Sequence, residues 1–470
     1  MRLGVKSIAV LAVAVFLVWG CRKDDEDSSN SNTSTEDGML AGSFTIYDDS
    51  PSAFSFPGTP VSNENDLRFY NGNSLFKKAW VAYGASTTAR DGLGPTFNSN
   101  NCSGCHLMDG RGRAPEYFGE KSSGFLVRLS VPGMGSDGGP IPEPTYGGQL
   151  QNQSVMDSVP VEGEVRVTYQ IQTGTYPDGT PYELQVPTYA FENLGFGPMS
   201  ADVLTSPRVA NQMIGLGLLE AISDNDILAL ADESDADGDG ISGKPNYVWN
   251  IEQGRATLGR FGWKANQPNI KQQVAGAFHG DIGITSSLFP VNNCPDPQNV
   301  CANAIGDTAL EIEDHTLSDV VLYSSVLGVP RQRDFNTTDV IEGKKLFKQI
   351  GCVKCHNDNY TTGIHPEIPE LSGINIHPYT DMLLHDMGPG LADGRPDYEA
   401  NGNEWRTAPL WGIGLFEMVN NHTNYLHDGR ARNIEEAILW HGGEAEQVKN
   451  QFMNLSASQR AQLITFLNSL

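Results

Sequence analysis

The chain has 470 residues and carries 57 acidic side chains against 31 basic ones, which gives a formal net charge of -26 at pH 7. This excess of negative charge argues against nucleic acid as a partner and favours a basic or neutral protein. Roughly 430 residues follow the N-terminal segment, enough for two or three domains with cores of their own.

Residues 1–21 have the features of an export signal. Arg2 and Lys6 precede a short apolar run over residues 8–19, and residues 17–21 (LVWGC) resemble a lipobox that ends in Cys21. An apolar run this short is typical of a signal peptide and not of a membrane span. We therefore expect an exported lipoprotein that a lipid on Cys21 holds at the outer membrane, on the periplasmic or the cell-surface face. The alternative is an ordinary signal peptide with an unmodified cysteine.

Residues 22–44 are rich in Ser, Asn, Asp and Glu. Such a segment has little to bury, so we expect it to form a disordered tether. Its opening residues 23–26 (KDDE) resemble the acidic surface-export signal of lipoproteins in some Gram-negative groups.

A first domain is expected over residues 45–334. A helix over residues 75–80 precedes a Cys-x-x-Cys-His motif, and another helix is expected from Ser206, because Ser caps a helix well and the following Pro suits the first turn. Met213 lies on the apolar stripe of that helix, where we expect it to pack in the core and not to bind haem iron. Between these helices, residues 124–192 contain runs of β-forming side chains and a hairpin turn. We interpret this stretch as a β-rich insertion.

A second domain is expected over residues 335–470. A helix over residues 340–347 leads into a second Cys-x-x-Cys-His motif. Asn433, followed by Glu436, is typical of a helix start, and Gly442 is typical of its end. Ser456 is expected to cap the last helix.

The two Cys-x-x-Cys-His motifs carry most of the chemical information. They consist of Cys102, Cys105 and His106 in the first domain and Cys352, Cys355 and His356 in the second. The thiols of such a motif add to the vinyl groups of a haem, and the His becomes the proximal iron ligand. A redox dithiol does not need that His, and a zinc ribbon pairs its Cys-x-x-Cys units about 15–20 residues apart. We therefore expect two covalently bound haem c groups, and a mainly α fold with two cytochrome c-like haem domains, the N-terminal one carrying the β-rich insertion.

Two further cysteines, Cys294 and Cys301, flank a short Pro-containing segment. In an oxidising compartment such a pair is expected to form a disulfide, with a free redox-active pair as the alternative.

Residues 235–243 (DADGDGISG) resemble the first half of an EF-hand loop. Asp235, Asp237 and Asp239 stand at positions 1, 3 and 5, and the carbonyl of Ile241 stands at position 7. Asn246 replaces the bidentate Glu, so an ordinary EF-hand is not expected. We predict a calcium site here, and the alternative is a solvated acidic turn.

Residues 91–95 (DGLGP) before the first motif and residues 425–432 (YLHDGRAR) after the second resemble the dihaem oxidoreductase (putative peroxidase) family. That family is similar to bacterial dihaem cytochrome c peroxidases and to MauG. In the peroxidases a distal haem ligand follows the His of His-Asp-Gly by fourteen residues. Counted from His427, the resemblance implies that His441 is that ligand, opposite His356. Met387 is the competing ligand.

The same resemblance implies a different N-terminal haem. Ser122 stands where regulated peroxidases have a removable His, so this haem is expected to be open to peroxide. Trp263 matches the Trp between the two haems, and Gln273 keeps its ten-residue spacing. Asp281 stands in place of the distal Glu of those families, but it is a shorter side chain and comes two residues earlier. His279, which is close to it in the sequence, is therefore a second candidate proton carrier. An acid in such a pocket can shuttle a proton during O–O cleavage.

We therefore predict that electrons pass from the C-terminal haem to an open N-terminal haem that reduces hydrogen peroxide or another small oxidant. The donor would be a small electron-donor protein or a quinol-linked donor. The alternatives are a non-enzymatic electron-transfer cytochrome, with both haems six-coordinate, and MauG-like oxidation of a protein substrate.

Overall fold

The computed structural model describes residues 38–470 except for 59–60, 88–89, 122, 157 and 305–309. The expected signal peptide, the lipid on Cys21, the acidic residues 23–26 and the open position at Ser122 all lie outside the described residues. Residues from Ser34 to Leu470 form one compact unit. Within the described part, every helix is too short or too polar to cross a membrane.

The expected mainly α class is wrong. The chain is only 29% helical and 19% strand, and the strands of the described residues form small sheets of two or three strands in both halves of the chain. The prediction missed these sheets because most of their strands are two to four residues long, too short to show a period of two in the sequence.

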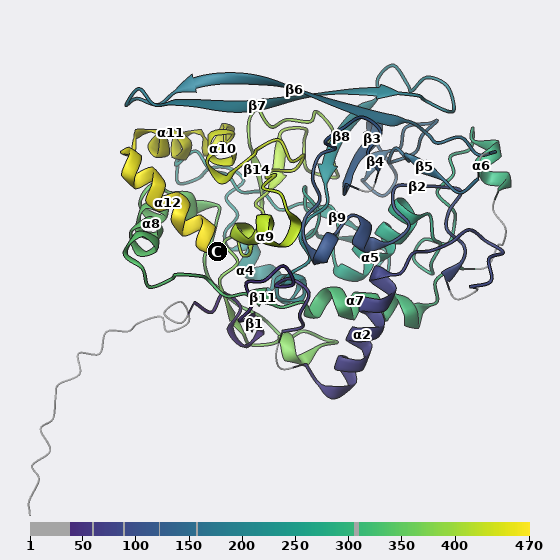
Figure 1. The fold of residues 1–470 in the computed structure, drawn as a ribbon, viewed down its shortest axis with the longest axis horizontal. Helices are drawn as coiled ribbons and strands as arrows, with labels where there is room; N and C mark the ends of the chain where they lie inside the picture. Colours follow the sequence, from purple (N-terminus) through teal and green to yellow (C-terminus); the bar gives the residue numbers. More distant parts are fainter. Residues whose placement is uncertain (1–37, 59–60, 88–89, 122, 157, 305–309) are drawn as a thin grey trace, which may run out of the picture. The chain divides into compact units, whose positions relative to one another are not determined.

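The N-terminal half contains helices and strands in alternation (Figure 1). Its helices are α2 (Asn63–Lys77), α3 (Leu216–Glu220), α4 (Asp224–Leu228), α5 (Ile270–Ala277), α6 (Asn299–Asn303) and α7 (Asp314–Val326). Its strands are β1 (Thr45–Ile46), β2 (Thr96–Phe97), β3 (Phe125–Met134), β4 (Pro140–Ile141), β5 (Gln153–Ser154), β6 (Glu164–Thr175), β7 (Pro181–Glu192), β8 (Leu204–Val209), β9 (Tyr247–Asn250), β10 (Arg255–Leu258) and β11 (Val329–Pro330).

The helix expected from Ser206 is a strand. Residues of β8 pair antiparallel with β3, and Pro207 lies opposite Val127. Because β8 is at the edge of its sheet, a proline without an N–H group is tolerated there. Met213 follows this strand in a loop before α3 and is buried.

The β-rich insertion is built around a long hairpin of β6 and β7. Twelve residues of each strand pair in one unbroken register, and the ribbon runs along the upper edge of the molecule in Figure 1. Its tip contacts the C-terminal half: the Tyr176 hydroxyl donates to Glu435 (2.7 Å), and Arg460 lies over the Tyr176 ring (3.9 Å). Arg460 also pairs with Asp178 at 2.7 Å. A hairpin from one half therefore holds two helices of the other.

The C-terminal half is the more helical part. It contains α8 (Thr338–Gln349), α9 (Phe416–Asn420), α10 (Ile434–Leu439), α11 (Glu446–Asn454) and α12 (Ala457–Ser469), with short strands β12 (Tyr360–Thr361), β13 (Asn375–Ile376), β14 (Leu384–Asp386) and β15 (Glu404–Arg406). The predicted caps are confirmed, since Asn433 accepts from the Glu436 amide and Ser456 forms a capping box with Gln459. Aromatic contacts of Phe347 in α8 with Phe466 in α12 fill the core between these helices.

The contact between the ribbon tip and the C-terminal half can be tested by measuring the free energy of unfolding. Tyr176 is 2% exposed, whereas Ile171 on the same ribbon is 49% exposed. We expect Tyr176→Ala to lower the free energy of unfolding by about 3 kcal/mol, because it leaves a cavity under Arg460. Ile171→Ala should change it by less than about 0.5 kcal/mol. Urea unfolding of the holoprotein measures both, and equal effects would contradict the docked arrangement.

Candidate haem sites

The second Cys-x-x-Cys-His motif follows α8 directly and lines an apolar cavity. Cys352 lies in a single helical turn, η6 (Cys352–Lys354), and Cys355 follows that turn directly. Both cysteines line the cavity. The Nδ1 atom of His356 lies 2.9 Å from the carbonyl oxygen of Tyr379, which leaves Nε2 free for a metal. Burial lowers the pKa of His356 to about 4, so the imidazole is neutral, as a ligand must be.

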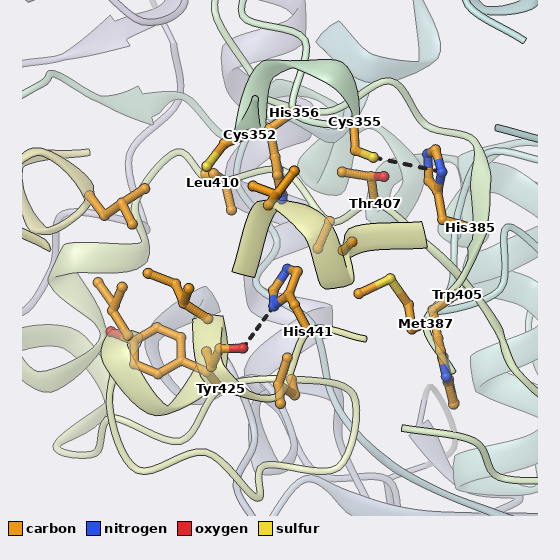
Figure 2. A pocket seen from close by; sticks show the side chains of 18 of the residues that line it. Cys352, Cys355, His356, His385, Met387, Trp405, Thr407, Leu410, Tyr425 and His441 are labelled. Atoms are coloured by element: carbon orange, nitrogen blue, oxygen red, sulfur yellow. Dashed lines mark hydrogen bonds between the residues drawn. The ribbon is translucent and has the colours of Figure 1, made fainter. Parts of the chain in front are cut away.

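His441 also lines this cavity. It follows α10 by two residues, and its Nδ1 atom lies 2.8 Å from the carbonyl oxygen of Ala437. Figure 2 shows His356 and His441 on opposite sides of the cavity, with Met387 to one side. Burial lowers the pKa of His441 as well. Both imidazoles therefore have Nε2 available and are in the ligand-competent form.

Two other imidazoles line this cavity: His427 stacks on Trp405 with ring centroids 3.7 Å apart, and His385 is occupied on both nitrogens. Nε2 lies 2.8 Å from Asp381, and Nδ1 lies 2.7 Å from Glu444. Burial lowers the pKa of His385, but the charge and hydrogen bond of Asp381, together with Cys355, outweigh it and raise the pKa well above its usual value. A charged imidazole cannot bind a metal, so His441 and Met387 remain as distal candidates.

The first motif has the same local construction. Cys102 and Cys105 lie at the turn η3 (Cys102–Gly104) and line a second cavity. The Nδ1 atom of His106 lies 2.7 Å from the carbonyl oxygen of Asn211, and burial lowers the pKa of this imidazole. In both motifs a Phe from the preceding helix lies 6.1 Å from the His ring, Phe76 in α2 and Phe347 in α8. The thiols, the free Nε2 and the apolar walls at each cavity fit one haem apiece.

The remaining lining differs between the cavities. Among the described residues, His106 is the only imidazole that lines the N-terminal cavity, which Gln273 and Asp281 also line. Met213 lines it too. The N-terminal cavity thus offers an acid and an amide where the C-terminal cavity offers a second imidazole.

The structure does not bring His279 into the cavity. Its ring stacks on Phe289 with centroids 5.2 Å apart, and Nε2 lies 2.9 Å from the carbonyl oxygen of Val291. His279 follows α5 on the short turn η5 (Phe278–Ile282), and two residues further along the same turn Asp281 lies in the cavity wall. On this turn the acid, and not the imidazole, faces the cavity.

Two functional candidates were missed by sequence reasoning. The Gln149 amide donates to Asp281 (2.8 Å) and to Asn98 (2.5 Å), so it fixes the acid in the cavity wall. Arg128 lines the cavity as well; burial lowers the pKa of its guanidinium, and the charge of Asp281 opposes that shift. Both residues come from the β-rich insertion, where no motif marks them.

Trp263 lines both cavities. Its indole N–H donates to the carbonyl oxygen of Val209 (2.8 Å), and it is 7% exposed. The ring therefore lies in the wall that the two haem cavities share, as the resemblance implied.

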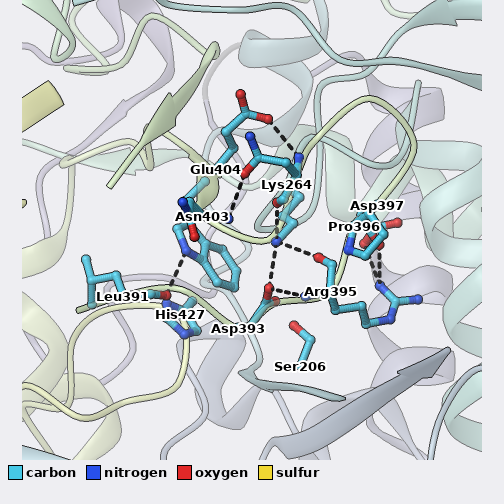
Figure 3. Close-up of polar contacts among 12 residues, drawn as sticks. Ser206, Lys264, Leu391, Asp393, Arg395, Pro396, Asp397, Asn403, Glu404 and His427 are labelled. Atoms are coloured by element: carbon cyan, nitrogen blue, oxygen red, sulfur yellow. Dashed lines mark hydrogen bonds and ion pairs between the residues drawn. The ribbon is translucent and has the colours of Figure 1, made fainter. Parts of the chain in front are cut away.

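The neighbouring Lys264 anchors this wall through a buried polar cluster (Figure 3). Its ammonium group is fully buried and lies 2.8–2.9 Å from oxygens of Asp393, Arg395 and Asn401. Burial lowers the pKa of Lys264 to about 8, and the carboxylate of Asp393 limits the shift. A charged lysine so enclosed fixes the backbone beside Trp263.

The acidic loop has a different grouping from the one expected. The carboxylates of Asp232, Asp235 and Asp237 have oxygens within 4.8 Å of one another. Asp239 instead pairs with Lys354 of the second motif at 2.8 Å, and one of its oxygens accepts from the Ile241 amide. Asp232 thus takes the place that the EF-hand pattern assigned to Asp239.

Cys294 and Cys301 form a disulfide with Cα atoms 5.8 Å apart. It closes an exposed loop beside the N-terminal cavity, and within that loop Gln298 is fully buried.

Comparison with known proteins bears on the whole of this unit. Three chains of solved structures match. One is from *Kuenenia stuttgartiensis* hydrazine synthase under 20 bar of xenon, 17% identical with a TM-score of 0.24 over 55% of this chain and 88% of that chain. No curated protein sequence matches. The family described as di-haem oxidoreductase, putative peroxidase, matches residues 34–470. With two haem motifs and two haem-sized cavities inside that matched span, the chain belongs to the di-haem oxidoreductase family.

Proposed function

We propose that this oxidoreductase binds two haems covalently and reduces hydrogen peroxide at the N-terminal one, with electrons that enter at the C-terminal one. The observation that carries the proposal is the unequal lining of the two cavities. His441 faces His356 across the C-terminal cavity, whereas Gln273 and Asp281 line the N-terminal cavity. Haem iron, when bound, supplies the one-electron chemistry and the open coordination position.

The chain's own residues would then hold the oxidant and supply protons. Asp281 is fixed by the Gln149 amide at 2.8 Å, so its carboxyl group has a defined direction. A positioned acid contributes about 10²–10⁴-fold to proton transfer. Gln273 can donate a hydrogen bond in the same cavity, and Trp263, which lines both cavities, offers an aromatic link between the two sites.

Three further proposals concern the electron donor, the membrane anchor and a calcium site. The net charge of -26 supports a basic or neutral electron donor, either a small protein or a quinol-linked carrier. We propose that a lipid on Cys21 holds the protein at the outer membrane. We also propose that the carboxylates of Asp232, Asp235 and Asp237 bind calcium.

The ligand assignment is tested by absorption and EPR spectra. We expect wild-type ferric protein to give one low-spin and one high-spin signal, the low-spin one from the His356–His441 pair. In His441→Ala that low-spin signal should be lost or changed, and in Met387→Ala it should persist. Two low-spin signals in the wild type would instead favour the electron-transfer cytochrome, and persistence of the signal in His441→Ala would contradict the bis-His assignment.

The role of Asp281 is tested by peroxide kinetics. We expect Asp281→Asn to slow peroxide-dependent oxidation of the reduced protein by about 100-fold or more, because the cavity loses its acid. Asp281→Glu restores the carboxyl group and should recover much of the rate. Stopped-flow absorption measures both. Equal rates in wild type and Asp281→Asn would remove Asp281 from the mechanism.

The calcium proposal is tested by titration calorimetry of the chelator-treated holoprotein. We expect one calcium ion to bind, and Asp237→Asn to weaken its affinity about ten-fold or more, because the site loses a charged ligand. Asp296→Asn, an exposed acid on the disulfide loop, is the matched control. No heat of binding in the wild type would leave a solvated acidic turn as the correct interpretation.

A further inference from the structure

A cluster of buried polar side chains lies beside the N-terminal haem cavity and is not explained by the fold. Its members are almost fully buried: Gln298 is 0% exposed, Glu162 1%, Gln149 4%, Gln151 4% and Asn98 6%. Burying polar groups costs free energy unless they are hydrogen-bonded. Such a cluster is therefore expected to serve a purpose beyond packing.

The hydrogen bonds of the cluster form a line that passes through Gln151, whose backbone amide contacts Glu162 and whose side chain contacts Gly280. Glu162 accepts from the side chain of Gln298 and from the backbone amide of Gln151, both at 2.7 Å. The Gln151 side chain donates to the carbonyl oxygen of Gly280 at 2.7 Å. Gln149 donates to that same carbonyl (3.3 Å) and to the Asp281 carboxylate (2.8 Å). The line therefore connects Glu162 to the acid in the cavity wall.

Three acceptors along this line have no protein partner. They are the side-chain oxygens of Gln149, Gln151 and Gln298. Exchanging the nitrogen and the oxygen of each amide would not remove the problem, because each nitrogen already donates a hydrogen bond to an oxygen. Buried acceptors of this kind are satisfied by internal water, which needs two to four polar partners. Because Gln149 and Gln151 meet at one carbonyl, a water beside Gly280 could serve both.

One end of the line lies beneath an exposed loop, and the other lies in the wall of the N-terminal cavity. Gln298 lies in the loop that the Cys294–Cys301 disulfide closes, and its neighbours in sequence, Pro297 and Asn299, are exposed. Asp281 lines the N-terminal cavity. The path thus leads from the disulfide-closed loop to the place where the proposed reaction needs protons.

Glu162 is suited to hold a proton on this path. Its neighbours bear no positive charge: Gln298 and Gln151 donate to it, and Glu143 is the carboxylate that faces it, with the Tyr146 hydroxyl also nearby. Burial raises the pKa of Glu162 to about 8, and Glu143 adds to the shift. The carboxyl group is therefore largely protonated at neutral pH.

We infer that Glu162, Gln151 and Gln149, with water between them, form a proton relay from the disulfide-closed loop to Asp281. This inference rests on the proposed function. Reduction of one hydrogen peroxide to two waters breaks the O–O bond and takes two electrons from the donor and two protons from solvent. In a cavity closed by apolar walls, those protons need a polar route. Glu162 gives its proton toward Asp281 and is reprotonated from solvent at the loop.

The test compares Glu162→Gln with Glu143→Gln. Both carboxylates are 1% exposed, but Glu143 bonds only to backbone amides of Thr145, Tyr146 and Ser200. We expect the wild-type peroxide reaction to slow above about pH 8, as Glu162 loses its proton. In Glu162→Gln this alkaline limb should be absent, and the rate below pH 8 should fall about ten-fold or more. Glu143→Gln should keep the solvent isotope effect, the rate at low pH and the alkaline limb, with the limb moved to lower pH because Glu162 loses a neighbouring negative charge.

A second readout does not require peroxide. Infrared difference spectra of the holoprotein, recorded as the N-terminal haem is reduced electrochemically, should show a protonated carboxyl band that disappears in Glu162→Gln and persists in Glu143→Gln. Absence of the band in wild type, or its persistence in Glu162→Gln, overturns the relay. A wild-type protein that shows this band but does not react with peroxide contradicts the proposed function and leaves the relay supported.

Discussion

The hydrogen bond from each motif histidine to a backbone carbonyl is the constraint on which both sites depend. His106 contacts Asn211 and His356 contacts Tyr379 through Nδ1. This contact fixes the ring orientation and directs Nε2 into the cavity, which a freely rotating imidazole would not do. The carbonyl of Tyr379 comes from the same half of the chain, 23 residues on, whereas that of Asn211 lies 105 residues away, beyond the whole β-rich insertion. The N-terminal site is therefore complete only when the insertion has folded.

The β-rich insertion makes three contributions to the folded chain. Its strand β3 contributes Arg128 to the wall of the N-terminal cavity, and the loop after β4 contributes Gln149, which holds Asp281 of that wall. Its ribbon reaches across to the C-terminal half, where the backbone of Gln185 donates to Glu436 in the helix that precedes His441. The segment just before the ribbon carries Glu162, the buried acid of the proposed relay. One element thus contacts the surroundings of both haems, which explains why the two halves form one compact unit.

Charge is distributed differently around the two cavities. In the C-terminal cavity burial keeps His356, His427 and His441 neutral, and the charged imidazole of His385 is enclosed by two carboxylates. In the N-terminal cavity an acid and a guanidinium, Asp281 and Arg128, face the same space. A neutral, doubly coordinating site suits electron entry, and a polar site suits chemistry that consumes protons. The asymmetry lies in side chains that are far from either motif in the sequence.

The sequence by itself determined the local chemistry. The spacing of Cys102, Cys105 and His106 and its repeat at Cys352 predict haem attachment without any tertiary information, and the caps at Asn433 and Ser456 follow from hydrogen bonds within one turn. Family resemblance located His441 and Trp263 at the cavities where the structure has them. Tertiary structure alone decided that Ser206 and Pro207 form an edge strand, because only the pairing with β3 outweighs their preference for a helix start. It also decided which of His279 and Asp281 faces the cavity, and which distant amides hold that acid. Local sequence patterns do not encode these contacts: Val127 pairs with Pro207, 80 residues on, and Gln149 contacts Asp281, 132 residues on.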